Sequence, residues 1–328
     1  MLTKVKRYCC MDEKEGPGLI LTVTLNPSID KLYLMDSIRP ETVMRVREVH
    51  NTAGGKGLNV SRTAAGLGEP VTAAGFIGGF NGQYLESLVD QPLIRCAFTR
   101  TASETRCCIN CWDLTDGKST EYLEPGAPVS AEEVGRFLAD FDRELAGADV
   151  VTISGSIPAG APETIYPDRI RRCRNAGVPV LVDTSGQRLI DAAAEKPTLI
   201  KPNTDEIRQL TGSLPASEAE QAAVTARLHA GGIPYVVLSL GAEGAVMACE
   251  AGVFRGCPPR LTPKNTVGCG DAMTAGFAVG IARRLPPEDC FRTALAVSAA
   301  GALSLFTGRF ETADYERLYP QIEIRKIG

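Results

Sequence analysis

Short runs of apolar and β-branched residues recur along the chain, and stretches with a helical period separate them. Six of these runs have the length and the continuous hydrophobicity of strands that are buried on both faces. They span residues 19–25, 71–77, 150–154, 178–182, 199–200 and 235–240. The pattern therefore predicts the interior strands of a parallel β-sheet.

The segments between these runs carry the signals of helix starts and ends. Ser130 with Glu133, and Ser217 with Glu220, have the spacing of capping boxes, in which each side chain accepts a hydrogen bond from the other residue's backbone N–H. A further helix is expected to end near Gly177, just before the next strand. Strand–helix units repeated in this way predict a doubly wound α/β sheet.

Two segments, at about residues 30–52 and 95–124, lack a helical period. In the first, residues 31–34 and 45–49 are predicted strands, and the second is expected to form two strands joined by a turn at residues 116–117. Two strand-rich insertions into an α/β chain predict a small separate sheet. We expect residues 18–328 to form one domain and residues 1–17 a loose tail, in which Met11 is an alternative start.

Composition and charge exclude several classes of protein. Of the 328 residues, 44% are hydrophobic and 23% are charged, which is ordinary for a globular chain. The 35 basic and 39 acidic residues give a net charge of −4, and no block of five basic residues offers a partner for nucleic acid. The longest apolar stretch without charge, residues 293–308, is too short to span a membrane and predicts a buried helix.

The cysteines and the N-terminal residues indicate a cytoplasmic protein. The first residues lack the apolar stretch of a secretion signal, and eleven cysteines are an odd number for a disulfide framework. Even the tightest cluster, Cys107, Cys108 and Cys111, lacks a second pair that would complete a zinc site, so we interpret the cysteines as small apolar residues. With only His50 and His229 in the chain, catalysis by histidine is a weak option.

The sharpest candidate for chemistry is the segment 265–276. Gly268 and Gly270 bracket a turn, and a helical pattern begins at once. Successive backbone N–H groups at a helix start form an anion-binding cradle, and the helix dipole adds positive potential. Asp271 lies at that helix start, where a carboxylate can accept a proton from a hydroxyl group. The alternative is an ordinary strand-to-helix turn with Asp271 as a cap.

A second glycine-rich segment spans residues 53–59. Its glycines let the backbone approach a ligand closely, while Lys56 and Asn59 add a cation and an amide. The spacing is not that of a Walker A loop, and no dinucleotide-binding fingerprint follows the first strand. The alternative is a tight loop before a helix.

Two further segments follow predicted strands. Asn203 and Glu206 are three residues apart, so they share one face of the first helical turn and suit a hard cation such as Mg²⁺, held mainly through waters. A helix cap at Asn203 is the alternative interpretation. Residues 239–244 close another strand with a glycine turn, at the end of the sheet where α/β proteins gather ligands.

The combined motifs resemble the ribokinase-like carbohydrate kinases, specifically the phosphofructokinase B family. The segments that carry the resemblance, in this order along the chain, are residues 24–30, 54–60, 154–158, 182–186, 201–203 and 265–276. The resemblance implies a three-layer α/β/α sandwich with a small β-sheet lid, which the two strand-rich insertions would supply. It also implies ATP, Mg²⁺ and a sugar hydroxyl as the acceptor of the phosphoryl group.

The resemblance assigns a role to each candidate residue. Asp271 is implied as the catalytic base, and the anion hole is implied at Gly268, Cys269 and Gly270. The sugar would be held by Asp30, Gly54, Gly55, Lys56 and Asn59. The nucleotide would lie against Lys201, Ser239, Gly241 and Gly244. Asn203 and Glu206 would organise the metal, and Arg106 would bind the phosphate already present on the sugar, since a guanidinium fork suits it.

The implied activity is an ATP-dependent kinase that converts a ketohexose phosphate to a bisphosphate, in the branch of 1-phosphofructokinase and tagatose-6-phosphate kinase. Residues 106–110 lack a lysine that 1-phosphofructokinases often carry, which tilts the expectation toward tagatose 6-phosphate. Cys269 stands where the family usually has alanine, but its backbone N–H remains. A 6-phosphofructokinase, a nucleoside kinase and a non-catalytic sugar-phosphate sensor are the alternatives. Exposed lid strands commonly pair between subunits in this family, which points to a homodimer.

Overall fold

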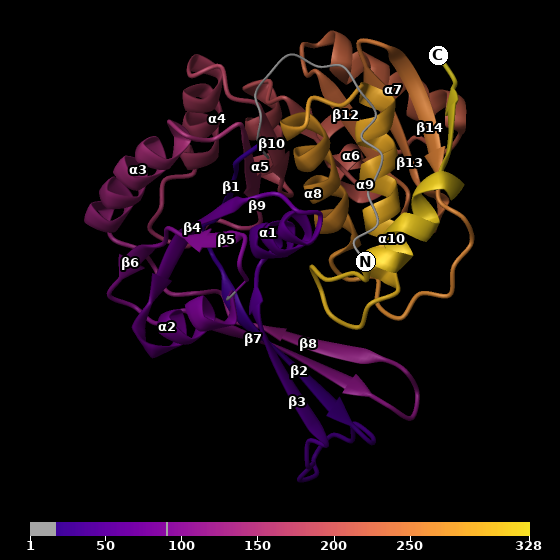
Figure 1. Cartoon of the computed structure of the whole chain (residues 1–328). Coiled ribbons are helices and arrows are strands. Elements are labelled where there is room, and N and C mark those ends of the chain that lie inside the picture. The colour runs from indigo at the N-terminus through magenta and orange to yellow at the C-terminus, as the bar shows by residue number, and fades with distance from the viewer. Residues whose placement is uncertain (1–17, 90) are drawn as a thin grey trace, which may run out of the picture.

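The computed structural model describes residues 18–89 and 91–328. The predicted tail at residues 1–17 lies outside the described residues. A large sheet with helices on both faces forms the body of the molecule, and a small sheet projects from it (Figure 1). This is the predicted three-layer α/β/α sandwich.

The interior of the large sheet consists of the predicted parallel strands. All six are present, within two residues of their expected bounds, as β1 (Ile20–Thr24), β4 (Val71–Gly78), β9 (Val150–Ser154), β10 (Val180–Asp183), β11 (Leu199–Ile200) and β12 (Tyr235–Ser239). They run in the order β12-β11-β10-β9-β1-β4. The chain winds from β1 to β4 on one side and later returns to β9 on the other, so β1 is the switch point of the sheet.

Both edges of the large sheet differ from the prediction. One edge gains three antiparallel strands, β13 (Ala245–Cys249), β14 (Gly252–Cys257) and β15 (Glu323–Lys326). At the other edge, β5 (Ile94–Cys96) and β6 (Thr99–Thr101) pair with β4. Residues 95–101, which the sequence placed in the second insertion, therefore belong to the body, because their register with β4 extends the large sheet.

Helices cover both faces of the large sheet. One face packs against α1 (Lys56–Gly66), α8 (Cys269–Ala282) and α9 (Pro287–Ala302), with α10 (Thr312–Leu318) and the 3₁₀ turn η2 (Tyr319–Gln321) beside α9. The other face packs against α3 (Ala131–Leu145), α4 (Ile165–Asn175), α5 (Gln187–Ala194), α6 (Thr204–Thr211) and α7 (Glu218–Ala230). The cluster around α2 (Gly79–Leu88) joins the large sheet to the small one. A short 3₁₀ turn, η1 (Gly241–Glu243), follows β12.

Several local predictions can be checked directly. The capping boxes at Ser130 and Ser217 are both formed. The helix predicted at residues 293–308 begins earlier, at Pro287, and ends at Ala302. Among the described residues, no helix is both long enough and apolar enough to cross a membrane.

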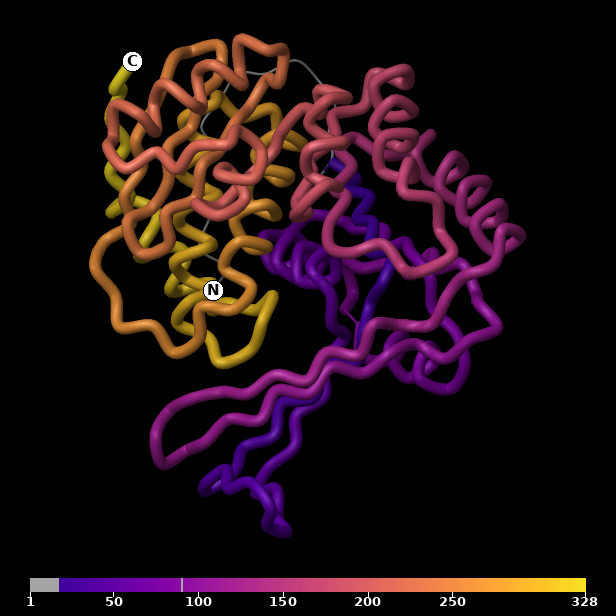
Figure 2. Tube along the Cα trace, turned by 180° about the vertical axis from the view of Figure 1, so that it is seen from behind, coloured from indigo at the N-terminus to yellow at the C-terminus, as the bar shows by residue number. Residues whose placement is uncertain are grey.

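The small sheet contains β2 (Ser28–Met35), β3 (Glu48–Gly54), β7 (Arg106–Asp113) and β8 (Ser119–Leu123), in the order β3-β2-β7-β8. The β7–β8 turn contains residues 116–117 as predicted. The second strand of the first insertion begins at Glu48 rather than at residue 45, because its pairing with β2 starts opposite Leu34. Seen from behind, the four strands leave the body together as an arm (Figure 2).

Candidate active site

A cleft of about 1550 Å³ lies at the carboxyl ends of the parallel strands and reaches the small sheet. Ligands of open α/β sheets bind in this position, at the switch point of the strand order. The cleft brings together most of the predicted site residues, namely Asp30, Gly55, Lys56, Asn59, Arg106, Lys201, Asn203, Glu206, Ser239, Gly241, Gly244, Gly268, Cys269, Gly270 and Asp271. Gly54 is the exception and lies behind the Asp30 side chain.

Asp271 lies in the first turn of α8, whose N-cap Gly268 has the left-handed φ of 83° that favours glycine. Its side chain is buried, and Asn59 Nδ2 donates a hydrogen bond to Asp271 Oδ2 at 2.7 Å. Burial, and after it the charge of Asp183, raises the pKa of Asp271 to about 6. Lys56 and the hydrogen bond from Asn59 oppose this rise. The carboxylate is therefore a stronger base than an exposed aspartate.

The start of α8 presents backbone N–H groups to the cleft. The first amides of a helix have no acceptor within it, and here they belong to Cys269, Gly270 and Asp271. The N–H of Cys269 donates to the backbone oxygen of Thr266 at 3.3 Å, a long hydrogen bond. A Cβ at position 270 would lie 3.1 Å from Lys201 Nζ, so glycine lets the ammonium group approach the helix end. Backbone amides and the Lys201 ammonium group thus lie together at the start of α8, an arrangement that suits a phosphoryl group.

A cysteine at a helix N-terminus usually has a lowered pKa, but the Cys269 thiol does not. Burial, and after it the charge of Asp271, raises the pKa of Cys269 to about 11. The thiol is thus protonated at neutral pH.

Asp183, at the end of β10, connects the two cationic groups of the cleft. Its buried carboxylate accepts from Lys56 Nζ at 3.0 Å, and its other oxygen lies 3.3 Å from Lys201 Nζ and from Thr274 Oγ1. Burial alone would raise the pKa of Asp183, but the effect of the two ammonium groups is larger and lowers this pKa to about 2. Sequence reasoning assigned no role to Asp183. The sequence signal that could have identified Asp183 is an acidic residue directly after the apolar run at residues 178–182.

Asp30 on β2 lies where the small sheet forms one side of the cleft. Ser28 Oγ donates to Asp30 Oδ1 at 2.6 Å, and burial raises the pKa of Asp30. A Cβ on Gly54 would lie 2.0 Å from Asp30 Cγ, so only glycine leaves room for this carboxylate. Beside it, Gly55 has a φ of 108°, which again favours glycine.

Arg106 begins β7, opposite Ser28 of β2. Its Nε and Nη2 donate to the backbone oxygen of Asn26, at 3.2 and 2.9 Å, and its Nη1 donates to that of Glu124 at 2.7 Å. These bonds fix the plane of the guanidinium at the wall of the cleft. A guanidinium carries five N–H donors, so donors remain for an anionic ligand.

The end of β12 and the η1 turn that follows it form another wall of the cleft. Ser239 ends β12, and its Oγ donates to the backbone oxygen of Pro202 at 3.4 Å. Gly241 begins η1, and Gly244, with a φ of 87°, lies so close to Gly256 that a Cβ would meet its carbonyl oxygen at 2.0 Å. This turn keeps the end of β12 open to the cleft.

Asn203 and Glu206 form a complete capping box at the start of α6. Asn203 Oδ1 accepts from the N–H of Glu206 at 2.9 Å, and Glu206 Oε2 accepts from the N–H of Asn203 at 2.9 Å. The cap interpretation thus describes their contacts, while both residues also line the cleft. Among the described residues, no group of three or more acidic, histidine or cysteine side chains is arranged to hold a metal by itself. A Mg²⁺ ion that is held mainly by waters and phosphate oxygens would need few ligands from the chain, and Asn203 and Glu206 are compatible with such an ion.

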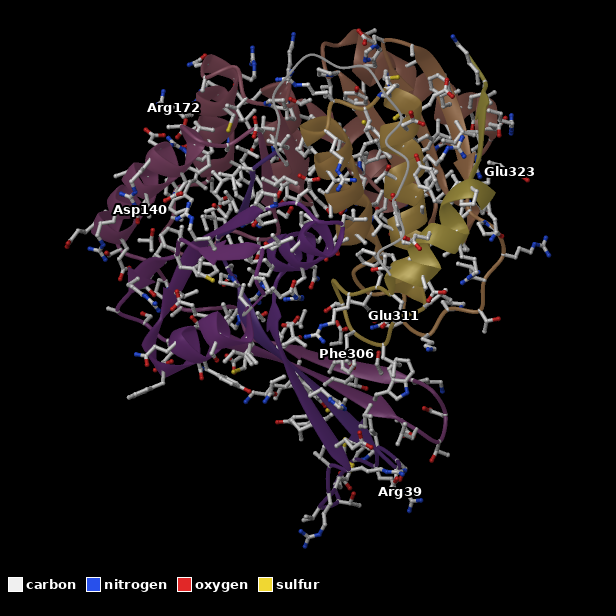
Figure 3. The ribbon with its side chains drawn as sticks, viewed as in Figure 1. Arg39, Asp140, Arg172, Phe306, Glu311 and Glu323 are labelled. Atoms are coloured by element: carbon white, nitrogen blue, oxygen red, sulfur yellow. The ribbon has the colours of Figure 1, made fainter. Side chains whose placement is uncertain are left out.

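The small sheet and the body also meet at the edge of the cleft. Phe306, which is labelled in Figure 3, belongs to the loop after α9. Its ring lies 5.3 Å from the ring of His50 on β3. Both residues line the cleft. A movement of the small sheet would therefore change the shape of the cleft.

An α/β/α sandwich with a small sheet beside the cleft is a ribokinase-like fold. The match to a family of carbohydrate kinases identifies a phosphotransferase with a hydroxyl acceptor. The chain belongs to the pfkB family of carbohydrate kinases, whose family model matches residues 23–308. Sugar kinases of this family use ATP.

Solved structures agree with this assignment. Phosphofructokinase-2 from Escherichia coli, solved with fructose-6-phosphate, is 26% identical with a TM-score of 0.84, over 93% of this chain and 99% of that chain. A Thermotoga maritima protein described as a possible 1-phosphofructokinase is 25% identical with a TM-score of 0.82, over 94% and 100%. Arabidopsis thaliana ribokinase, at 20% identity and a TM-score of 0.72, over 92% and 98%, shares the fold.

Proposed function

We propose that the protein is an ATP-dependent kinase that phosphorylates a ketohexose phosphate, tagatose 6-phosphate or fructose 1-phosphate, to a bisphosphate. One observation carries the proposal: the buried carboxylate of Asp271 lies beside the start of α8, in the same cleft as Asp30 and Arg106. A proton acceptor, an anion cradle and a sugar-phosphate site then share one space.

Asp271 takes the proton of the attacking sugar hydroxyl. Phosphoryl transfer has a loose transition state, in which the proton can leave late, so positioning matters more than base strength. The hydrogen bond from Asn59 fixes the direction of the carboxylate. With its pKa at about 6, the carboxylate is ionised at neutral pH.

The transferred group carries negative charge that the chain must offset. The N–H groups at the start of α8 and the ammonium groups of Lys56 and Lys201 would surround the transferred group. The Asp183 carboxylate contacts both ammonium groups and so holds the two lysines in place. Preorganised charges of this kind stabilise a transition state without having to rearrange during the reaction.

Mg²⁺, when bound, would neutralise the phosphate oxygens of ATP. Asn203 and Glu206 are the residues that would organise it, through waters, at the start of α6. The nucleotide would lie along the wall formed by Lys201, Ser239 and residues 241–244.

The phosphate already on the sugar would bind Arg106, whose guanidinium plane is fixed at the wall of the cleft. Asp30 would accept hydrogen bonds from the sugar hydroxyls, and the amide of Asn59 would donate one to them. The two phosphate-rich substrates then approach each other from opposite walls, and closure of the small sheet would exclude water.

Fructose 6-phosphate is the alternative substrate. The similarity to Escherichia coli phosphofructokinase-2, solved with fructose-6-phosphate, supports this choice. The missing lysine in residues 106–110 supports tagatose 6-phosphate instead.

A coupled assay of ADP formation tests the proposal. It compares tagatose 6-phosphate, fructose 1-phosphate, fructose 6-phosphate, the free hexoses and buffer alone. We expect ADP to form with at least one sugar phosphate far faster than with the free hexoses. Binding of a sugar phosphate without ADP formation would instead identify a sensor.

We also propose a cytoplasmic homodimer that forms through the small sheet. Val49, Tyr122 and Leu123 are exposed apolar side chains on its strands, which supports a contact surface. Light scattering during size-exclusion chromatography tests this, with Tyr122→Lys expected to shift the protein toward monomer.

A further inference from the structure

Arg62 is a buried cation in α1, one turn after Asn59, and is only 3% exposed. Its guanidinium donates to the backbone oxygen of Ala53 at the end of β3, to Asn59 Oδ1 at 2.5 Å and to the backbone oxygen of Thr307 at 3.3 Å. Asn59 and Asp271 line the cleft, whereas Arg62 is not among its lining residues. Arg62 can therefore affect the reaction in two ways, through its hydrogen-bond partners and through its charge, which acts on Asp30 and Asp271.

The contact with Arg62 decides which way the amide of Asn59 points. The two ends of an asparagine amide are alike in shape, so their partners set its orientation. A guanidinium only donates, so the oxygen of Asn59 faces Arg62; an ionised carboxylate only accepts, so the NH₂ group faces Asp271. A half-turn of the amide would place oxygen against carboxylate and NH₂ against guanidinium, and both contacts would be repulsive.

We propose that Arg62 is a positioning residue of the phosphoryl transfer: it holds the oxygen of Asn59 and thereby keeps the NH₂ group of that amide on the Asp271 carboxylate. The inference rests on the proposed function, because it concerns the base of that reaction. Without Arg62, the amide is free to turn, and the carboxylate loses the hydrogen bond that fixes its direction.

The base is faced by charged or titratable groups from each element around it. These are Asp183 at the end of β10, Lys56 and Arg62 from α1, Lys201 after β11, and Cys269 from α8 itself. The hydrogen bond from Asn59 lowers the pKa of Asp271 against burial and Asp183. Losing this bond raises the pKa above about 6 and also misdirects the carboxylate.

Arg62→Gln removes both the charge of Arg62 and its donor-only character, whereas Arg62→Lys keeps both. Lysine only donates and keeps the oxygen of Asn59 turned toward position 62, whereas glutamine can donate or accept and leaves both orientations open. For Arg62→Gln we expect kcat to fall about 10- to 100-fold, the loss typical of a misplaced reacting group. The KM values should change less than about threefold, because the binding contacts remain. Arg62→Lys should keep most of the wild-type kcat.

The pH dependence distinguishes the two roles of the arginine. If Arg62 acts only by its charge, kcat of Arg62→Gln recovers at high pH, where Asp271 is fully ionised, and the inference is overturned. If Arg62 orients the amide, kcat stays low on the alkaline plateau. Arg169→Gln is the matched control: this arginine is largely buried, pairs with Asp142 and contacts the Phe141 ring, remote from the cleft. We expect it to lower stability without changing the pH profile.

Carboxyl NMR provides a readout that does not depend on activity, with the Asp271 signal assigned by its loss in Asp271→Asn. Its titration midpoint should move up in Arg62→Gln and stay near wild type in Arg62→Lys. Unchanged titration and kcat in Arg62→Gln overturn the inference. If that variant does not fold, Arg62→Lys decides: a wild-type midpoint with a lower Tm supports the inference, and a raised midpoint contradicts it. A wild type without kinase activity would contradict the proposed function alone, since the titration still tests the amide.

Discussion

The large sheet and the small sheet support their residues in different ways. β1, β4, β9 and β10 are buried along their whole length, with helices on both faces, whereas every residue of β8 is exposed. Side chains at the ends of buried strands are held firmly, and an exposed sheet opens at a lower free-energy cost. Under the proposed function, the body would position the reacting groups, and the small sheet would recognise the sugar phosphate.

The largest effect should come from the body. Asp271→Asn preserves the shape of the side chain but removes the proton acceptor, so turnover should fall at least ~10²-fold with every sugar. ADP formation measures this, and Asp168→Asn, in the first turn of α4, is the control. Near-wild-type turnover of Asp271→Asn would show that Asp271 is not the base.

The same variant should not lose stability. The pKa of Asp271 is raised from 3.8 to about 6, so the folded state binds the proton more tightly than the unfolded state does. Ionisation therefore destabilises the fold above about pH 6, and the penalty disappears below about pH 4. Thermal unfolding should show Asp271→Asn more stable than wild type at about pH 8, with the difference lost in acid.

How far the sequence predicts the fold depends on how local the signal is. The strand at residues 150–154 is a short run dominated by β-branched residues, and its place in a parallel sheet could be predicted. β5 and β6 are three residues each and contain Arg95 and Arg100, so no run identifies them. Their pairing with β4 arises from contacts distant in the sequence, which is why they were placed in the wrong sheet.

The same distinction applies to the site. Asp271 and Asn59 lie in glycine-rich motifs whose chemistry is visible in the sequence. Asp183 gains its importance only when Lys56 and Lys201, which are far apart in the chain, meet at its carboxylate. Arg62 and Asn59 are only three residues apart on α1, but the contact of Asn59 with Asp271, on which the proposed role of Arg62 depends, joins residues that are far apart in the chain.

Recognition by the small sheet is tested at Arg106. A charged hydrogen-bond pair contributes roughly 1.5–3 kcal/mol, so Arg106→Ala should lower kcat/KM for the sugar phosphate by about 10- to 150-fold. The KM for ATP should move little, and the free hexose should be less affected. Arg100→Ala, an exposed arginine paired with Glu86, is the control. Equal losses for both sugars would make Arg106 a structural residue, with Lys56 the next candidate for the phosphate.

The pH dependence probes the burial of the base. Because burial and Asp183 raise the pKa of Asp271 to about 6, kcat/KM should fall below about pH 6 as the base takes up its proton. Each further pH unit should lower it about tenfold. Steady-state kinetics across pH measures this. Full activity down to about pH 4 would contradict a buried base.

A smaller effect is expected at the metal. Glu206→Gln keeps a carbonyl oxygen for the capping box but removes a charge, so the Mg²⁺ concentration for half-maximal rate should rise several-fold. Glu220→Gln, in the equivalent capping box of α7, is the matched control and should leave the Mg²⁺ requirement unchanged. Identical Mg²⁺ dependence in both variants would reduce Glu206 to a helix cap.

The smallest effect is expected at Cys269. Its proposed role is that of its backbone N–H, so Cys269→Ala should keep the rate within about twofold of wild type. Since burial and Asp271 raise the pKa of the thiol to about 11, thiol reagents should react slowly at neutral pH. A severe loss of rate in Cys269→Ala would mean that the thiol itself takes part.

The central claim, phosphoryl transfer from ATP to a sugar phosphate, is tested most directly by ³¹P NMR of the reaction mixture. The wild-type protein, ATP, Mg²⁺ and the preferred sugar phosphate should give ADP and a second phosphate ester on the same sugar. Inorganic phosphate should stay at the level of a mixture without protein. Formation of ADP and inorganic phosphate regardless of the sugar, or no consumption of ATP with any sugar phosphate, would contradict the account.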